Sequence, residues 1–202
     1  RTFSVHLGAS VHMYTEDILE EDIQKSKILH LEAYQFDDAR EMVLHAIDVA
    51  RKYGTLVSID FSDPGLIRRH KDLLQGLLPK LDLIFLNEKE ATEFTGLPAR
   101  EAVEILGQKV QIAIVKLGEL GSLIAYQGKV ISINPTPAQA IDTNGAGDSY
   151  AAGFLYGHSL GWSMEQCGRL GSLLAAKVVE QRGVQFGTIN VEELKTKAMR
   201  HG

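Results

Sequence analysis

The chain has little cysteine and no long apolar run, and each shortage excludes a class of protein. Its single cysteine, Cys167, excludes an internal disulfide and a cluster of thiolate metal ligands. No apolar run approaches the roughly 18 residues that a membrane-spanning helix needs, and the segment from Arg1 to Ser10 lacks the apolar core of a secretory signal. These shortages predict a cytoplasmic protein that has no membrane as its partner.

Basic residues are also few. The 21 lysines and arginines are outnumbered by 26 acidic residues, which gives a net charge of -5. A protein that neutralises many phosphates of a nucleic-acid duplex needs a basic surface, so the composition argues against nucleic acid as a partner. The seven histidines show no H-x-x-x-H spacing, and a histidine metal centre is therefore not predicted.

The composition and length are those of an ordinary soluble domain. Hydrophobic residues make up 45% of the 202 residues and charged residues 23%, close to average usage. We expect a single α/β domain over residues 1–202. Because the sequence begins with Arg1 rather than methionine, we also expect it to start inside a longer reading frame or after processing.

Strand-like and helix-like segments alternate along the chain in a βαβ rhythm. The strand-like runs of the first half are almost wholly apolar, which is typical of a parallel sheet covered on both faces. The pattern predicts a three-layer αβα fold with a mainly parallel central sheet, in which the last two strands form a hairpin. We expect strands at 27–31, 55–60, 83–86, 112–116, 122–126 and 130–133. We expect helices at 38–53, 66–78, 88–95, 100–106, 151–160 and 164–182.

The segment from Asp142 to Asp148, D-T-N-G-A-G-D, is a glycine-containing turn that runs directly into a helical pattern. Glycine lets the backbone approach a ligand, and the first N–H groups of a helix lack partners within it, so the turn can hold a phosphate group. Asp148 would lie in the first turn, where its carboxylate can accept a proton from an attacking hydroxyl. In the alternative interpretation, an aspartate only caps the helix and the glycines only form a tight turn. The aspartates on both sides of the glycines favour the phosphate site.

Two other phosphate-binding motifs fit the sequence less well. Six residues separate Gly121 from Gly128 where a Walker loop has four, and Val130 occupies the position of the required Ser or Thr. In a dinucleotide-binding fingerprint, Gly or Ala would stand where Tyr150 is, and the segment 135–140 does not resemble the first strand of that fold. The Walker loop is rejected, and a dinucleotide-binding oxidoreductase stays as an alternative.

Asn87 and Glu90 follow an expected strand and so lie at its carboxyl end, where open α/β sheets bind ligands. They could organise a hydrated Mg²⁺ that bridges the phosphates of ATP. Asn followed three residues later by Glu is also the pattern of a capping box at a helix start, and on its own the pattern favours the cap. The turn from Lys116 through Gly118 to Gly121 either lets a nucleotide approach the backbone or is a plain β-turn.

Taken together, the D-T-N-G-A-G-D string, the Asn87-x-x-Glu90 pair and the Gly118-x-x-Gly121 turn resemble the ribokinase family of carbohydrate and nucleoside kinases, often called the PfkB family. The seven-residue string is a highly specific match. Softer matches extend the resemblance over nearly the whole chain and are similar to the adenosine-kinase-like bacterial branch. They lie at Arg1-Thr2-Phe3, Leu7-Gly8-Ala9, 29–34 and 167–171.

The resemblance implies a ribokinase-like αβα sandwich and an ATP-dependent phosphotransferase. Asp148 would be the catalytic base that deprotonates a primary hydroxyl of a sugar or nucleoside. The backbone of Gly145, Ala146 and Gly147 would be the anion hole for the migrating phosphoryl group. The resemblance does not indicate which sugar or nucleoside is the acceptor.

The resemblance also implies where the nucleotide and the ions bind. Asn87 and Glu90 would hold Mg²⁺ through water. The nucleotide would lie between the turn that starts at Lys116 and the helix near Ser172 and Ala176, although relatives often have Asn in place of this serine. A monovalent cation, usually K⁺, is expected beside three residues of the last third, which are Asp142, Asn144 and Gly183.

The sequence departs from the family at its amino end. Members run to roughly 300 residues, within the range of large α/β domains, and carry an early Gly-Gly substrate motif and lid strands that this sequence lacks. We therefore interpret it as the carboxyl-terminal two thirds of a kinase. A second hypothesis is a truncated or degenerate kinase that binds nucleotide without catalysis. Relatives commonly dimerise through the lid, so a homodimer is a further expectation.

Overall fold

The computed structural model describes residues 8, 12–185 and 189–199, and its centre is a six-stranded sheet. Strands β1 to β4 run parallel, whereas β5 and β6 run antiparallel to their neighbours. The expected mainly parallel sheet and the closing hairpin are confirmed. In their order across the sheet, the strands are β1 (Ile28–Glu32), β2 (Leu56–Asp60), β3 (Leu83–Asn87), β4 (Ile112–Lys116), β5 (Ser122–Tyr126) and β6 (Lys129–Ile133).

Helices connect the parallel strands and follow the hairpin. The α-helices are α1 (Glu20–Lys25), α2 (Gln35–Asp38), α3 (Arg40–Tyr53), α4 (Pro64–Leu77), α5 (Glu88–Thr95), α6 (Ala99–Leu106), α7 (Ala146–Ser159), α8 (Met164–Val179) and α9 (Val191–Met199). Short 3-10 turns lie at Thr15–Asp17, Leu78–Lys80 and Gly118–Leu120. In the part of the chain that these elements cover, no helix is both long and apolar enough to cross a bilayer.

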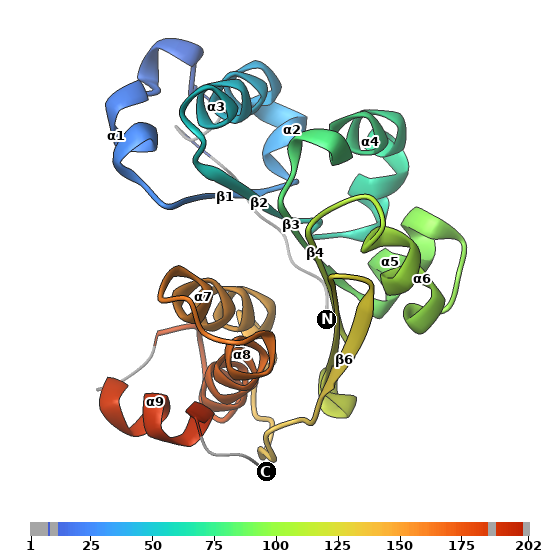
Figure 1. Cartoon of the computed structure of the whole chain (residues 1–202), viewed down its shortest axis with the longest axis vertical. Coiled ribbons are helices and arrows are strands. Elements are labelled where there is room, and N and C mark those ends of the chain that lie inside the picture. Colours follow the sequence, from blue (N-terminus) through green and yellow to red (C-terminus); the bar gives the residue numbers. More distant parts are fainter. Residues whose placement is uncertain (1–7, 9–11, 186–188, 200–202) are drawn as a thin grey trace.

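The helices cover both faces of the sheet. Figure 1 shows α3 to α6 on one face and α7 and α8 on the other. Helix α9 lies outside α8 and contacts it. The three-layer αβα arrangement expected from the sequence is therefore confirmed.

The apolar strands of the sequence are buried on both faces. In β3, Ile84 and Leu86 join the core under α3 to α6, while Leu83 and Phe85 join the core under α7 and α8. This alternation follows the two-residue period of a strand. Because both faces need apolar side chains, each parallel strand forms an almost continuous hydrophobic run.

The start of α7 differs from the expectation. The helix begins at Ala146, with Gly145 as its N-cap in the left-handed region at φ 74°. The apolar periodicity predicts a start at residue 151, which is too late, whereas the expectation from the motif that Asp148 lies in the first turn is confirmed. Glycine and serine in its first turn are weak helix formers, so the periodicity is not visible there. Helices α1, α2 and α9 were not predicted. Helices α1 and α2 have only six and four residues, too few for a helical pattern. Helix α9 has nine residues, of which only Leu194 and Ala198 are buried.

Helices α7 and α8 pack with their backbones in close approach. A Cβ built on Gly153 of α7 would lie 2.8 Å from the carbonyl oxygen of Leu170, and one built on Gly171 of α8 would lie 2.8 Å from that of Tyr150. Real Cβ atoms do not come this close to backbone, so only glycine fits at these two positions. The contact fixes α7 relative to α8, and the first turn of α7 contains the last three residues of the D-T-N-G-A-G-D string.

Gly153→Ala should therefore destabilise the protein by about 2 kcal/mol, because the added methyl group must push α7 away from α8. Urea denaturation measures this change. Gly76→Ala in α4 is the matched control, since its Cβ would meet nothing within 4 Å and the substitution should be neutral or stabilise by up to about 1 kcal/mol. Equal stabilities of the two variants would contradict the close packing.

Candidate active site

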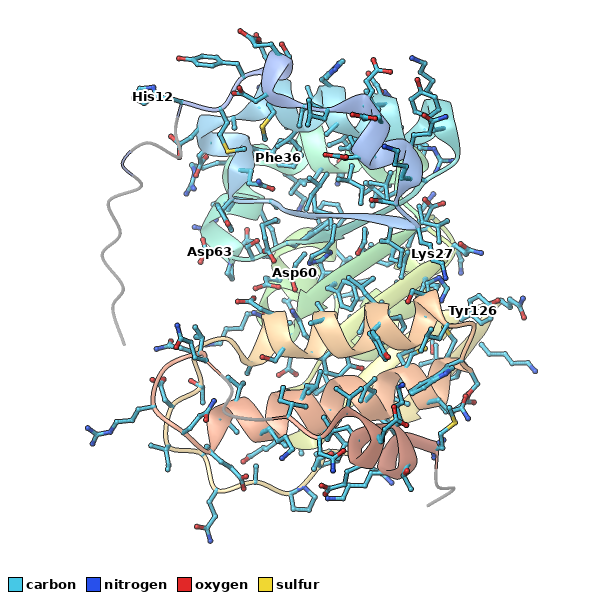
Figure 2. The ribbon with its side chains drawn as sticks, turned by 90° about the vertical axis from the view of Figure 1, so that its left-hand side faces the viewer. His12, Lys27, Phe36, Asp60, Asp63 and Tyr126 are labelled. Atoms are coloured by element: carbon cyan, nitrogen blue, oxygen red, sulfur yellow. The ribbon has the colours of Figure 1, made fainter. Side chains whose placement is uncertain are left out.

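Polar side chains end all four parallel strands at one edge of the sheet. Glu32, Asp60, Asn87 and Lys116 are the last residues of β1, β2, β3 and β4. The strand register places Glu32 opposite Asp60 and Asn87 opposite Lys116. Figure 2 shows Asp60 toward this edge and Lys27, which precedes β1, toward the opposite one. The site is therefore assembled from the carboxyl ends of neighbouring strands.

The first turn of α7 presents backbone N–H groups. The Ser149 N–H donates to the Gly145 carbonyl oxygen at 2.9 Å, which is the first bond of the helical ladder. The N–H groups of Gly147 and Asp148 precede it and lie outside that ladder. A Cβ built on Gly147 would lie 3.1 Å from Lys116 Nζ, so an ammonium group adjoins this turn. Helix N–H groups and an ammonium together favour an anion.

The Asp148 carboxylate lies in the same turn and is exposed to solvent. Partial burial is the largest cause that raises its pKa above the usual value, and the negative charges of Glu32 and Asp60 raise it further. Lys116 and His30 act in the opposite direction. A carboxylate with a raised pKa accepts a proton more readily, as a general base requires. The structure thus brings Asp148 and the glycine turn together, as the sequence motif predicts.

Three polar residues that influence the Asp148 pKa were missed by the sequence reasoning, and they are His30, Glu32 and Asp60. Ser62 Oγ donates to Glu32 Oε2 at 2.8 Å, and His30 Nε2 lies 3.7 Å from Glu32 Oε1. The signal that could have found Glu32 and Asp60 was their position at the ends of expected strands.

Asn87 and Glu90 form the capping box at the start of α5. The Asn87 N–H donates to Glu90 Oε2 at 2.7 Å, and the Glu90 N–H donates to Asn87 Oδ1 at 2.9 Å. Glu90 is only 2% exposed, and its other carboxylate oxygen accepts from the Asn87 amide. Burial is the main cause that raises the Glu90 pKa to about 7, and the charges of Asp60 and Asp63 add to it.

These contacts limit how Mg²⁺ fits the pair. Both Glu90 oxygens already accept hydrogen bonds from Asn87, and the carboxylate has almost no exposed surface, so direct coordination does not fit. Contact through the water shell of the ion fits better. Across residues 12–185 and 189–199, no three His, Cys, Asp or Glu side chains gather in a metal-ligand cluster. The predicted role of the pair in holding Mg-ATP stays a prediction.

The three residues predicted to bind a monovalent cation lie together. Asp142 Oδ1 accepts from the Asn144 N–H at 3.1 Å, and Asp142 Oδ2 accepts from the Gly183 N–H at 3.4 Å. The carboxylate therefore ties the glycine turn to the segment after α8. These bonds explain the grouping structurally, and K⁺ binding stays a prediction.

The remaining predicted nucleotide contacts have structural roles of their own. A Cβ on Gly121 would lie 2.0 Å from the Ile133 carbonyl oxygen, so a glycine is required there to form the turn before β5. Ser172 Oγ accepts from the Thr136 N–H at 2.8 Å. Ser172 and Ala176 are each only 9% exposed in α8. Their contact with a nucleotide, like that of Gly118, stays a prediction.

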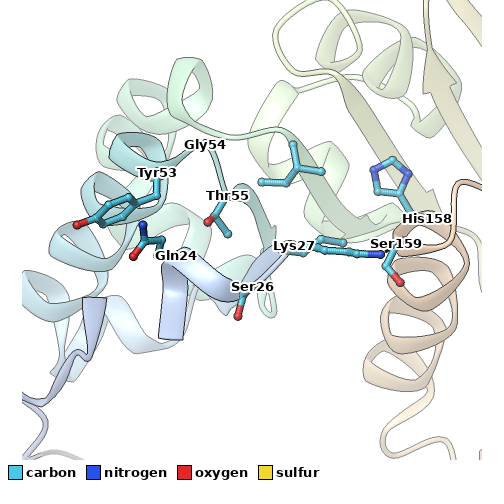
Figure 3. A pocket seen from close by; sticks show the side chains of 10 residues that line it. Gln24, Ser26, Lys27, Tyr53, Gly54, Thr55, His158 and Ser159 are labelled. Carbon is cyan, nitrogen blue, oxygen red and sulfur yellow. Dashed lines mark hydrogen bonds between the residues drawn. The ribbon is translucent and has the colours of Figure 1, made fainter. Parts of the chain in front are cut away.

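A cavity of about 340 Å³ lies at the opposite edge of the sheet. Figure 3 shows Lys27 extended toward Ser159, whose carbonyl oxygen accepts from Lys27 Nζ at 2.8 Å. None of the predicted site residues lines this cavity. It is therefore separate from the site at Asp148.

The raised Glu90 pKa predicts a stability change with pH. Because the folded state holds the proton more tightly than the unfolded state, the wild type should lose stability relative to Glu90→Gln as pH rises from about 4.5 to about 7. A shift of this size corresponds to a loss on the order of 3 kcal/mol. Glutamine keeps the acceptor that the capping box needs. Urea denaturation in metal-free buffer at several pH values measures the difference.

Glu93→Gln on the same helix is the control. Arg68 lowers the Glu93 pKa through a hydrogen bond, so the wild type should gain stability over this variant as pH rises through the acid range. A pH-independent difference between the wild type and Glu90→Gln would contradict the buried-carboxylate account.

The chain is similar to known kinases along most of its length. A family model described as pfkB family carbohydrate kinase matches residues 1–190. An uncharacterized sugar kinase of Archaeoglobus fulgidus is 27% identical over 190 residues, which are 93% of this chain and 74% of the relative. Sequence similarity therefore extends far beyond the glycine turn.

Two solved structures are similar in both fold and sequence. A probable sugar kinase from Rhizobium etli CFN 42 has a TM-score of 0.88 at 31% identity, and adenosine kinase from Sinorhizobium meliloti has a TM-score of 0.84 at 30% identity. The matches cover 92% and 93% of this chain but only 58% of each solved chain. The chain thus spans less than two thirds of the length of these structures. Because the family model covers nearly the whole sequence and the fold agrees with it, this chain belongs to the pfkB family of carbohydrate kinases.

Proposed function

We propose that the chain is the catalytic part of an ATP-dependent kinase that transfers the γ-phosphoryl group to a hydroxyl of a sugar or nucleoside. The observation that carries the proposal is the position of the exposed Asp148 carboxylate, which lies in the same helical turn as two N–H groups outside the helical ladder. The Lys116 ammonium adjoins that turn. We also propose that residues 1–202 form one domain.

In the proposed reaction, Asp148 accepts the proton of the acceptor hydroxyl. The hydroxyl oxygen bonds to the γ-phosphorus in line with the leaving group, and the bond from that phosphorus to the β–γ bridging oxygen breaks to release ADP. The N–H groups of Gly147 and Asp148 and the Lys116 ammonium stabilise the negative charge of the migrating group. Mg²⁺, when bound with ATP, supplies further neutralisation of the phosphates, and Asn87 and Glu90 would hold its water shell.

The acceptor side of the site is polar and acidic. Glu32 and His30 both lie close enough to Asp148 to influence its pKa, and they can exchange hydrogen bonds with the hydroxyl groups of a sugar or of the ribose of a nucleoside. Glu32 and His30 are therefore consistent with an acceptor that carries several hydroxyl groups. We propose that the rest of the acceptor pocket comes from outside the chain described, which spans only 58% of similar solved kinases.

Asp148→Asn should lower turnover by a factor of about 10² to 10⁴, because a positioned general base contributes that much, while the affinity for Mg-ATP changes little. ADP release, measured with a panel of sugars and nucleosides on the protein with its natural flanking sequence, tests this. Asp48→Asn, which changes an exposed carboxylate of α3, is the control and should leave turnover unchanged.

The outcomes separate the two candidate functions. Turnover of Asp148→Asn within a few-fold of the wild type would refute the assignment of the base. If the wild type binds ATP but transfers phosphate to no acceptor in the panel, the non-catalytic nucleotide-binding module is the better account.

A further inference from the structure

Asp60 is a buried carboxylate to which neither the D-T-N-G-A-G-D string nor the capping box assigns a role. It is the last residue of β2 and is only 3% exposed. A charge in such a place is costly unless it is paired and hydrogen-bonded. The partners of Asp60 therefore indicate what its charge does.

The Asp60 carboxylate is held from two sides. Its Oδ2 forms an ion pair with Lys116 Nζ. Its Oδ1 accepts from the Ser62 N–H at 3.0 Å, in a turn where Ser62 adopts φ 63°, a conformation that non-glycine residues rarely adopt. Because both oxygens are engaged, the carboxylate has one orientation.

The Lys116 ammonium is held in turn against the first turn of α7. The lysine side chain is 14% exposed. A Cβ built on Gly147 would lie only 3.1 Å from its Nζ. An ammonium group has three donors, so donors remain after the ion pair with Asp60. Without an anchor, the long lysine side chain would sample many rotamers.

We propose that Asp60 is a positioning residue for phosphoryl transfer: it holds the Lys116 ammonium beside the Gly147 backbone, where the ammonium donates to the γ-phosphoryl group of bound ATP. The inference rests on the proposed kinase function and assigns within it a residue 56 positions away from the lysine in sequence. Stability alone does not account for the pair, because a buried ion pair contributes little net stability. The ion pair instead fixes a hydrogen-bond donor, the Lys116 ammonium, at the site of phosphoryl transfer.

The affinity of the protein for ATP divided by its affinity for AMP reports this contact, since AMP has no γ-phosphate. Isothermal titration calorimetry of the full chain measures both affinities. Lys116→Met should lower the ratio about tenfold, because one charge-assisted hydrogen bond to the phosphate is lost. Asp60→Asn should lower the same ratio severalfold and leave AMP affinity unchanged. The double variant should have the ratio of Lys116→Met alone.

Two further variants keep the test decisive. Asp60→Glu retains the charge but displaces the carboxylate by one methylene, so it should also lower the ratio, and it replaces Asp60→Asn if that variant does not fold. Asp82→Asn is the matched control. Asp82 accepts from the Val57 N–H at 2.7 Å at the opposite edge of the sheet and pairs with Arg51, so its loss should lower the melting temperature without changing the ratio.

The inference is overturned if Asp60→Asn lowers ATP and AMP affinity equally, which is the signature of a merely structural residue. It is also overturned if the effects of Asp60→Asn and Lys116→Met add in the double variant, since the aspartate would then act independently of the lysine. If the wild type prefers ATP and the Asp60 variants keep the same ratio, this inference is rejected but the proposed function is not. A wild type that binds ATP no better than AMP rejects the proposed function together with it.

Discussion

The approach of the Lys116 ammonium to the Gly147 backbone joins the sheet to the first turn of α7, and the rest of the site depends on this contact. It brings the lysine at the end of β4 against a glycine in that turn, where a Cβ would lie 3.1 Å from Lys116 Nζ. It also requires that α7 lie close to the sheet, where Phe154 of α7 packs edge-on against Phe85 of β3. The packing of α7 on the sheet thus determines where backbone N–H groups, ammonium and carboxylate meet.

The charge balance of the site favours a ligand that brings cations with its phosphates. Glu32, Asp60, Glu90 and Asp148 contribute carboxyl groups, and the charges that oppose them in the pKa shifts of Asp148 and Glu90 come from Lys116 and His30. Free polyphosphate would be repelled by this excess of acidic groups, whereas a nucleotide that arrives with Mg²⁺ carries less negative charge. Partial burial, followed by the charges of Glu32 and Asp60, raises the Asp148 pKa and so makes this carboxylate a better proton acceptor.

Most of the fold could be predicted from the sequence because the strands are covered on both faces, and their apolar runs therefore mark the bounds of β4 and β5 to the residue. The local string from Asp142 to Asp148 likewise predicted the glycine turn and the place of Asp148 in the first turn of α7, while the role of Asp148 as the base stays a prediction. The contact of Asp60 with Lys116 could not be read in this way, because the two residues are 56 positions apart and meet only when their strands align. The apolar periodicity placed the start of α7 too late, because Gly147 and Ser149 in its first turn are weak helix formers.

A crystal structure of the protein with Mg²⁺ and a non-hydrolysable ATP analogue tests the central claim most directly. The account predicts the γ-phosphate within hydrogen-bonding distance of the Gly147 N–H and of Lys116 Nζ, with the Asp148 carboxylate facing the in-line position. A nucleotide bound with its phosphates away from the first turn of α7, for example in the cavity beside Lys27, would contradict it.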